Sequence, residues 1–179
     1  MLLHYKNLTI RNATTEDADL LSSWWNDGAV MAHAGFPNGT GETTSEIAER
    51  IKKDTDESRR LIIELAHRPI GEMNYSSCPD KESGHIAEIG IKICDFSEQE
   101  KGYGKIVLSM MISSLFQDFG YQKIILDTNL NNKRAQHVYE TLGFKKLRIR
   151  ENSWRNQLGE LQSAVDYELI PEDFVNFAK

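Results

Sequence analysis

Apolar and polar residues alternate in several short runs of this chain, and such alternation predicts β-strands. The clearest run covers residues 85–94. Its isoleucines, Ile89, Ile91 and Ile93, share one face, and Glu88 lies on the other. Further strands are expected over residues 8–10, 60–66, 70–76, 123–129, 143–150 and 161–169. Three of the strands follow one another through short turns, which predicts an antiparallel meander.

Apolar residues spaced by three and four predict helices in four other segments. The strongest covers residues 105–119, whose apolar side chains form one broad face before Gly120 ends the helix. The others run from Thr14 or Thr15 to residue 25, from Thr43 or Thr44 to about residue 53, and over residues 132–142. Loops or turns are expected over residues 29–41, 78–84 and 151–159, and a short turn after Pro171.

The order of these elements predicts a mixed α/β fold with one sheet of about seven strands and about four helices. A chain of 179 residues suits one domain, so we assign residues 1–179 to a single domain. A domain of this size buries enough surface to fold without disulfides or a structural metal. Its 40% of hydrophobic and 27% of charged residues are typical of globular proteins.

Charge and cysteine content exclude several classes of function. The net charge of −6 and the absence of a long run of Lys and Arg disfavour a nucleic-acid partner. The two cysteines, Cys78 and Cys94, show neither zinc-ligand nor C-x-x-C spacing, so we expect no metal. The N-terminal residues lack the apolar core of a signal peptide, and no stretch is long enough to span a membrane. We therefore expect a cytoplasmic protein without a membrane partner.

The most informative segment is the loop between the strand at 85–94 and the helix at 105–119. Gly102 and Gly104 allow backbone N–H groups to approach a ligand closely where the helix begins. The first turn of a helix has unpaired N–H donors and a partial positive charge, which favour an anion such as phosphate. Lys101 and Lys105 add positive charge. The spacing matches neither a P-loop nor a dinucleotide-binding glycine motif, and an unliganded helix-entry turn is the simpler alternative.

Two motifs resemble those of the GCN5-related N-acetyltransferases (GNAT). Gln99-x-x-Gly102-x-Gly104 matches the first signature of that family. The segment from Asn132 to Phe144, Asn-x-x-Ala-x-x-x-Tyr-x-x-x-Gly-Phe, resembles the second. The preceding strand, Ala87-Glu88-Ile89-Gly90-Ile91, is similar to that of the branch containing the ribosomal-protein N-terminal acetyltransferases. The resemblance spans nearly the whole chain, and it implies the GNAT fold, with a largely antiparallel sheet that is splayed at the cofactor site.

The resemblance implies that acetyl-CoA is the co-substrate and that the glycine loop holds it. Backbone groups of Ile91, Lys92 and Ile93 would pair with the pantetheine arm as an added strand does. The pyrophosphate would bind in the loop formed by Gln99, Glu100, Lys101, Gly102, Tyr103, Gly104 and Lys105. Asn132 would contact pantetheine, and Lys133 or Arg134 would reach the 3′-phosphate. Helix capping is the alternative for Asn132, and solvated surface charge is the alternative for Arg134.

The resemblance also implies the catalytic groups. The Tyr139 hydroxyl would protonate the departing thiolate, since a phenol and a thiol have similar pKa values. A proton acceptor for the attacking amine is expected at Glu88 or Glu72, and His33 is a third candidate. Core packing is the simpler explanation for Tyr139, and a solvent-facing position is the simpler one for the two glutamates. Backbone N–H groups near Ile93 would polarise the thioester carbonyl.

The function predicted on this basis is transfer of an acetyl group to a primary amine by direct attack in a ternary complex. The amine belongs to a protein N-terminus or to a small molecule such as an aminoglycoside or a polyamine. The resemblance implies that Trp24, Trp25, Phe36 and Trp154 lie near the acceptor, and helix packing is the simpler explanation for Trp24 and Trp25. Two alternatives remain at this point: a non-catalytic acyl-CoA-binding module with the same fold, and an unrelated phosphate-binding protein. The family resemblance also allows a homodimer, although no residue indicates one.

Overall fold

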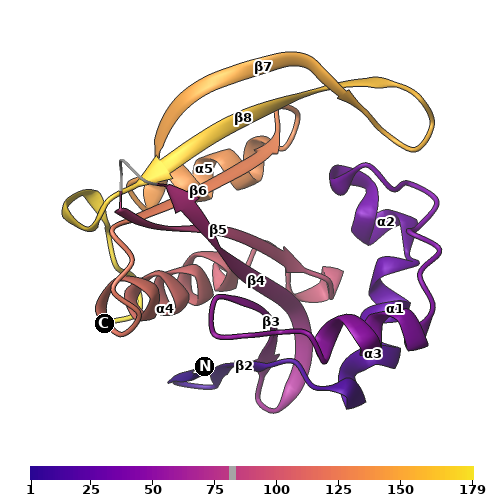
Figure 1. Cartoon of the computed structure of the whole chain (residues 1–179), viewed down its shortest axis with the longest axis horizontal. Coiled ribbons are helices and arrows are strands. Elements are labelled where there is room, and N and C mark those ends of the chain that lie inside the picture. The colour runs from indigo at the N-terminus through magenta and orange to yellow at the C-terminus, as the bar shows by residue number, and fades with distance from the viewer. Residues whose placement is uncertain (81–83) are drawn as a thin grey trace.

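The computed structural model describes residues 1–80 and 84–179 and shows one sheet of eight strands in the order β1-β2-β3-β4-β5-β6-β8-β7 (Figure 1). The strands are β1 (Leu2–Tyr5), β2 (Leu8–Asn12), β3 (Ser58–Leu65), β4 (Arg68–Asp80), β5 (Gly84–Ile93), β6 (Lys123–Asn129), β7 (Lys145–Arg155) and β8 (Leu161–Leu169). All neighbours pair antiparallel except β5 and β6, which pair in parallel. The predicted mixed α/β class is confirmed.

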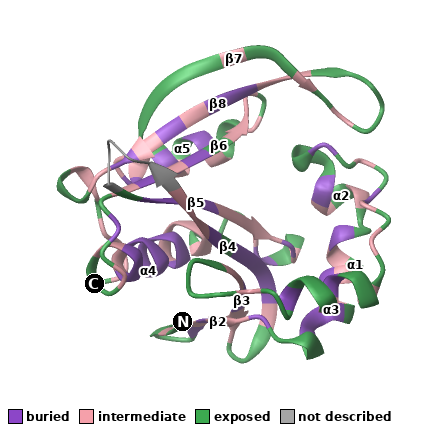
Figure 2. Cartoon of the chain, viewed as in Figure 1, coloured by how far each residue is buried: buried purple, intermediate pink, exposed green. Residues whose placement is uncertain are grey.

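Helices cover both faces of the sheet. They are α1 (Ala18–Trp25), α2 (Gly28–Met31), α3 (Thr44–Ile51), α4 (Tyr103–Gln117) and α5 (Lys133–Thr141), with short 3₁₀ turns η1 (Thr15–Asp17), η2 (Ala32–Ala34), η3 (Phe96–Glu98) and η4 (Pro171–Asp173). The larger core lies between the sheet, α4 and α5, and α4 is buried along most of its length (Figure 2). The smaller core joins α1 and α3 to Ile62 on the other face. None of the described helices is long and apolar enough to cross a membrane.

The parallel pairing of β5 and β6 is short. It joins Ile86 to Lys123, Ala87 to Ile124 and Glu88 to Ile125, and then ends. On its other side β5 stays paired with β4 as far as Ile93. The remainder of β5 therefore has a sheet edge that no strand among the described residues covers, and this is the splay expected from the family resemblance.

Local sequence signals explain where the helices begin. Thr43 and Glu46 form a reciprocal capping box at the start of α3, as the threonine and the acidic residue three positions later predict. Gly102 caps α4 in the left-handed conformation, with φ of 84°. Such a backbone conformation is costly for residues with a side chain but open to glycine.

The structure differs from the sequence pattern in four segments. The N-terminal residues form an additional strand, β1, which pairs antiparallel with β2. The expected loop at 29–41 begins with α2 and η2, because Asp27 caps the helix through a hydrogen bond from the Ala29 N–H. The expected turn at 78–84 instead continues β4 to Asp80 and opens β5 at Gly84; residues 81–83 lie outside the described residues. The expected loop at 151–159 is strand as far as Arg155, because β8 pairs with it.

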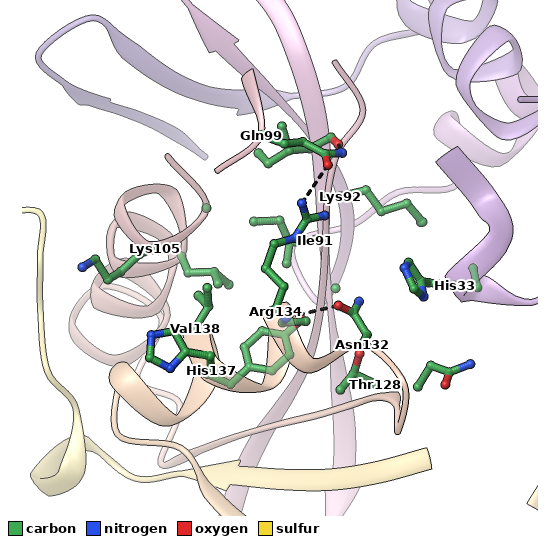
Figure 3. Close-up of a pocket in the computed structure, with 18 of the residues that line it drawn as sticks. His33, Ile91, Lys92, Gln99, Lys105, Thr128, Asn132, Arg134, His137 and Val138 are labelled. Carbon is green, nitrogen blue, oxygen red and sulfur yellow. Dashed lines mark hydrogen bonds between the residues drawn. The ribbon is translucent and has the colours of Figure 1, made fainter. Parts of the chain in front are cut away.

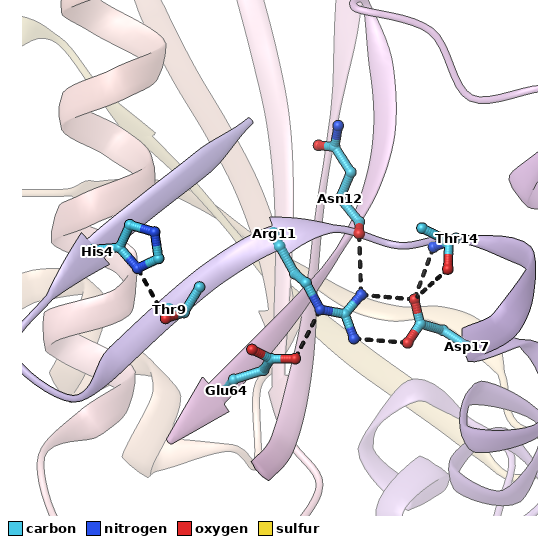
Figure 4. Close-up of polar contacts among 7 residues, drawn as sticks. All are labelled: His4, Thr9, Arg11, Asn12, Thr14, Asp17 and Glu64. Atoms are coloured by element: carbon cyan, nitrogen blue, oxygen red, sulfur yellow. Dashed lines mark hydrogen bonds and ion pairs between the residues drawn. The ribbon is translucent and has the colours of Figure 1, made fainter. Parts of the chain in front are cut away.

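An ionic network fastens the first helical segment to the sheet (Figure 4). The Arg11 guanidinium donates to both carboxylate oxygens of Asp17, each at 2.8 Å, and to Glu64 at 2.7 Å. The Thr14 N–H donates to the same Asp17 carboxylate at 2.8 Å. Burial by itself raises the pKa of Asp17, but the Arg11 and Thr14 hydrogen bonds outweigh burial and hold that pKa below its usual range. Asp17 is thus ionised, paired and only 8% exposed.

We expect Asp17→Asn to lower the free energy of unfolding by about 1–3 kcal/mol at neutral pH, because it leaves a partly buried Arg11 without its main partner. A carboxylate with a lowered folded-state pKa stabilises above its unfolded pKa of about 4, and this contribution is lost as the pH falls through the folded value. The difference between native and variant protein should therefore shrink in acid. Chemical denaturation at pH 7 and at about pH 3 measures this difference in the free energy of unfolding.

Glu49→Gln is the control, because Glu49 forms an exposed pair with Lys52 and such pairs contribute little. If Asp17→Asn lowered the free energy of unfolding as much in acid as at neutral pH, Asp17 would not be the ionised partner of Arg11.

Candidate functional site

A cavity of about 1020 Å³ lies where β5 and β6 separate (Figure 3). One part is lined by β5, the loop after it and the facing sides of α4 and α5. The other part is lined by α2, η2, the last residues of β6 and the strands β7 and β8. The cavity therefore runs from the glycine loop to the opposite face of the sheet.

The open edge of β5 offers backbone hydrogen bonds to a ligand. The Cys94 N–H donates to the Ile70 carbonyl of the β4 side, and the Lys92 carbonyl lies against Gly71 of β4. Because backbone groups of successive strand residues point to opposite edges, those of Ile91 and Ile93 point into the splay. The Ile93 carbonyl there accepts a hydrogen bond from the Gln99 Nε2 at 2.8 Å. Ile91 and Ile93 thus occupy the expected position, whereas the backbone groups of Lys92 face β4.

The glycine loop presents free N–H groups to the same cavity. Among the described residues, no acceptor is recorded for the N–H groups from Glu100 to Lys105; the next N–H, of Ile106, donates to the Gly102 carbonyl. A Cβ atom built on Gly102 or Gly104 would meet nothing within 4 Å. The loop therefore combines unpaired donors, the positive end of α4 and open space, which are the requirements for an anion site.

Charged side chains surround this loop. Arg134 of α5 donates to the Gln99 Oε1 at 2.9 Å and lies 3.6 Å from Glu100 (Figure 3). The Lys101 ammonium pairs with Glu98 at 3.0 Å. The Lys105 ammonium lies 4.1 Å from the centre of the Phe177 ring. Arg134 and Lys105 both line the cavity, so two cations border the open space beside the glycines.

Asn132 caps a helix and also lines the cavity. Its Oδ1 accepts a hydrogen bond from the Ala135 N–H at 3.1 Å and so caps α5. Its side chain also lines the cavity. No acceptor for the Asn132 Nδ2 is recorded among the described residues, so this donor is available to a ligand.

Tyr139 lines the cavity from α5 and is only 7% exposed. Its ring packs edge-on against Phe144 at 5.8 Å and is tilted against Tyr167 at 5.9 Å. Burial, with a smaller contribution from the nearby Asp127 carboxylate, raises the pKa of Tyr139 to about 12. The phenol therefore holds its proton across the physiological range, and Tyr139 both packs in the core and lines the cavity.

Glu72 lines a second cavity of about 500 Å³, on the face of the sheet covered by α1 and α3. Its Oε1 accepts hydrogen bonds from the Trp25 indole at 2.9 Å and from the Lys92 ammonium at 3.0 Å. Lys92 borders both cavities. Glu72 is thus a fixed, ion-paired carboxylate at their junction, and it does not line the cavity that holds Tyr139.

Glu88 lines neither cavity. It is exposed, and it lies beside Ile125 where β5 and β6 are still paired. The splay begins only after this residue, so the expectation that Glu88 points into the cleft is wrong for the cavities described here.

The part of the cavity beyond β5 contains His33, the third candidate base, together with Asp127 and Arg150, which the sequence analysis did not identify. His33, on η2, projects into the cavity (Figure 3). Asp127 of β6 and Arg150 of β7, which pair at 2.5 Å, line the same cavity. Of the expected aromatic residues, Trp154 lines this cavity, Trp25 and Phe36 line the second, and Trp24 packs on the smaller core. The Asp27 cap was the sequence signal that could have placed His33 on a helical segment.

Comparison with known proteins identifies the family. The family model described as acetyltransferase (GNAT) domain matches residues 7–145, more than half of the chain. A curated relative, the SPbeta prophage-derived uncharacterized N-acetyltransferase YokL of Bacillus subtilis (strain 168), is 25% identical over 145 residues, which cover 79% of this chain and 77% of the relative.

Solved structures share the fold. The spermidine N-acetyltransferase of Vibrio cholerae, in complex with CoA and spermine, superposes with a TM-score of 0.82 at 22% identity, over 95% of this chain and 99% of that one. A ribosomal-protein α-N-acetyltransferase in complex with coenzyme A gives a TM-score of 0.82 at 13% identity, over 95% of this chain and 98% of that one. At these identities the likeness is one of fold.

Proposed function

The chain belongs to the GNAT family of acetyltransferases, and from this premise we propose that it transfers an acetyl group from acetyl-CoA to a primary amine. The proposal rests on three features that line the same cavity. An uncovered strand edge, a row of free N–H groups and a buried phenol line it together. The CoA and the amine in the solved complex of the Vibrio cholerae neighbour support the same two reactants.

In this proposal the cofactor follows the cavity from α4 to the splay. The pyrophosphate accepts hydrogen bonds from the N–H groups of Glu100 to Lys105, at the positive end of α4. Arg134 and Lys105 supply positive charge beside it, and Arg134 exchanges its neutral partner Gln99 for a phosphate. The pantetheine amides pair with the backbone groups of Ile91 and Ile93, as an added strand would. The Asn132 amide donates to the same arm.

The bonds change as follows. The neutral amine nitrogen bonds to the thioester carbonyl carbon, whose oxygen accepts a hydrogen bond from a backbone N–H near Ile93. The carbon–sulfur bond then breaks, and the thiolate takes the Tyr139 proton. The nitrogen loses its extra proton to a base, which leaves an amide and free CoA.

The pKa of about 12 for Tyr139 is well above the pKa of an ordinary thiol, about 8.5. The acid and the leaving group therefore differ in acidity. Proton transfer from phenol to such a thiolate in water would be unfavourable. Burial, however, also raises the pKa of a thiol, because a low dielectric disfavours the thiolate. The sulfur occupies the same enclosed space as the phenol, so burial shifts acid and leaving group in the same direction.

His33 is the base that the proposal favours. Of the three candidates, it alone lines the cavity that contains Tyr139, whereas Glu72 borders the second cavity and Glu88 borders neither. An imidazole is the side chain best suited to accept a proton near neutral pH. Glu72 instead holds Lys92 in place at the junction.

The first test is calorimetric titration with acetyl-CoA, with ATP and NAD as controls. We expect acetyl-CoA alone to bind. Gly104→Glu should reduce binding at least 100-fold, because it places bulk and negative charge where the pyrophosphate lies. Gly104→Ala separates folding from binding: its Cβ meets nothing within 4 Å, so it should fold and gain about 0.5 kcal/mol of stability. Equal affinity of Gly104→Glu and the native protein would exclude the loop as the phosphate site.

Tyr139→Phe should leave acetyl-CoA affinity intact and lower kcat about 100-fold, in the range of general-acid contributions. Because the Tyr139 pKa is about 12, the phenol stays protonated and native kcat should not decline between about pH 8 and pH 10 through loss of this proton. Release of free thiol measures kcat for the variant and for the native protein across this pH range. Tyr5→Phe, far away on β1, is the control. An unchanged kcat, with acetyl transfer shown to be rate-limiting, would remove Tyr139 from the mechanism.

His33→Ala should lower kcat about 10- to 100-fold without changing acetyl-CoA affinity. Added imidazole should restore part of the rate, since it supplies the missing base in the space the side chain vacates. His67→Ala, in the exposed turn between β3 and β4, should be neither impaired nor rescued. A native rate in His33→Ala would assign the proton to water or to another group.

The alternative, an acyl-CoA-binding module without turnover, gives a different result in the same experiments. Acetyl-CoA would bind and depend on Gly104, but no amine would release thiol. The coexistence of a protonated phenol and an imidazole in the cavity favours the enzyme.

A further inference from the structure

Lys105 differs from the other lysine and arginine side chains that line the large cavity. Lys92, Arg134 and Arg150 each lie beside a carboxylate, at 3.0, 3.6 and 2.5 Å respectively. For Lys105 no carboxylate partner is recorded among the described residues, and its ammonium lies 4.1 Å from the centre of the Phe177 ring. Figure 3 shows this side chain extending from α4 toward the segment after η4, drawn in yellow. The charge of Lys105 is therefore available to a ligand.

The segment after η4 holds the ring in place on α4. The Asn176 Nδ2 donates to the Ser113 Oγ at 2.8 Å, and the Phe177 N–H donates to the Ser109 Oγ at 3.0 Å. Lys105, Ser109 and Ser113 are spaced by four and therefore share one face of the helix. The segment thus runs back along this face toward the glycine loop and fixes Phe177 beside the first turn of α4.

An aromatic ring can localise an ammonium without neutralising it. The face of the ring attracts the cation through its quadrupole and carries no net charge. A carboxylate in the same place would cancel the charge, and an incoming anion would have to compete with it. A lysine side chain has many rotamers, and ordering them on binding costs free energy. The contact with Phe177 therefore leaves Lys105 both charged and partly ordered before a ligand arrives.

Lys105 lies where an anion would bind. It belongs to the first turn of α4, and it lines the cavity together with Gly102 and Gly104. Side chains of a helix lean toward its N-terminus, which here is the end formed by the glycine loop. The loop N–H groups, for which no acceptor is recorded among the described residues, and the ammonium thus border the same space.

Building on the cofactor site proposed above, we propose that Phe177 is a positioning residue whose ring pre-orients Lys105 for the pyrophosphate of CoA. Phe177 does not line the cavity, so it does not contact the cofactor itself. Its contribution to binding passes through the Lys105 ammonium. Removal of the ring should therefore weaken CoA binding only while Lys105 is present.

A double-mutant cycle, measured by calorimetric titration with CoA, tests this coupling. Phe177→Leu keeps an apolar side chain but removes the ring, and it should weaken CoA binding about 3-fold, within the strength of an exposed cation–π contact. Lys105→Met should weaken binding about 10-fold, because a charged hydrogen-bond donor to the pyrophosphate is lost. The double variant should bind CoA as Lys105→Met alone does.

Two control variants separate the ring face from the packing of the segment. Phe177→Tyr keeps an aromatic ring beside Lys105 and should bind CoA within 2-fold of the native protein. Phe174→Leu removes the other ring of the segment, which packs on Phe116 of α4 at 6.0 Å, and should also bind CoA within 2-fold. Dephospho-CoA keeps the pyrophosphate but lacks the 3′-phosphate, so Phe177→Leu should weaken its binding by the same factor.

Each contrary result has a distinct meaning. If Phe177→Leu weakened binding equally with and without Lys105, or if it tightened binding, the ring would not position the ammonium and the proposal would be overturned. A loss seen with CoA but not with dephospho-CoA would place Lys105 at the 3′-phosphate and overturn the assignment to the pyrophosphate. Folded native protein that binds no CoA would instead overturn the cofactor site, and with it the proposed function.

Discussion

The structure depends on the point at which β5 and β6 stop pairing. Up to Glu88 the two strands hold each other in parallel; beyond it β5 stays with β4, and β6 stays with β8. Backbone groups that a sheet would normally satisfy are left for a ligand, and burying them unpaired would be costly. The cavity that both Tyr139 and His33 line lies at this separation.

The glycine-loop side of the cavity contains backbone conformations that lower the stability of the fold. Glu100 and Gly102 both have positive φ values, and Gly104 stands in the first turn of α4, where alanine would stabilise the helix. These features leave N–H groups unpaired beside open space. Burial raises the pKa of Tyr139, so the phenol holds its proton more tightly in the low-dielectric interior. The same interior would surround a thioester sulfur, so one environment sets the acidity of both partners.

The acceptor side is built from parts distant in the sequence. Trp25 from α1 and Lys92 from β5 hold Glu72 between the two cavities. The tip of the β7–β8 hairpin reaches the segment after η2 through Gln157. This part of the molecule therefore depends on contacts between segments that carry no motif, whereas the glycine loop is one short, recognisable segment.

The sequence by itself determined most of the sheet, four helices and the glycine loop, because alternation, helical spacing and glycines act over a few neighbouring residues. Gln99, Gly102, Gly104 and Tyr139 were identifiable from motifs that resemble those of the family, and all four line the large cavity. Only the tertiary structure decided that β1 pairs with β2, that β7 extends to Arg155 and that Glu88 lies outside the cavity while His33 lies inside it. Those outcomes depend on which strand lies beside which, and on where two neighbours part. Pairing between distant segments is set by the packing of the whole chain, and no local pattern records it.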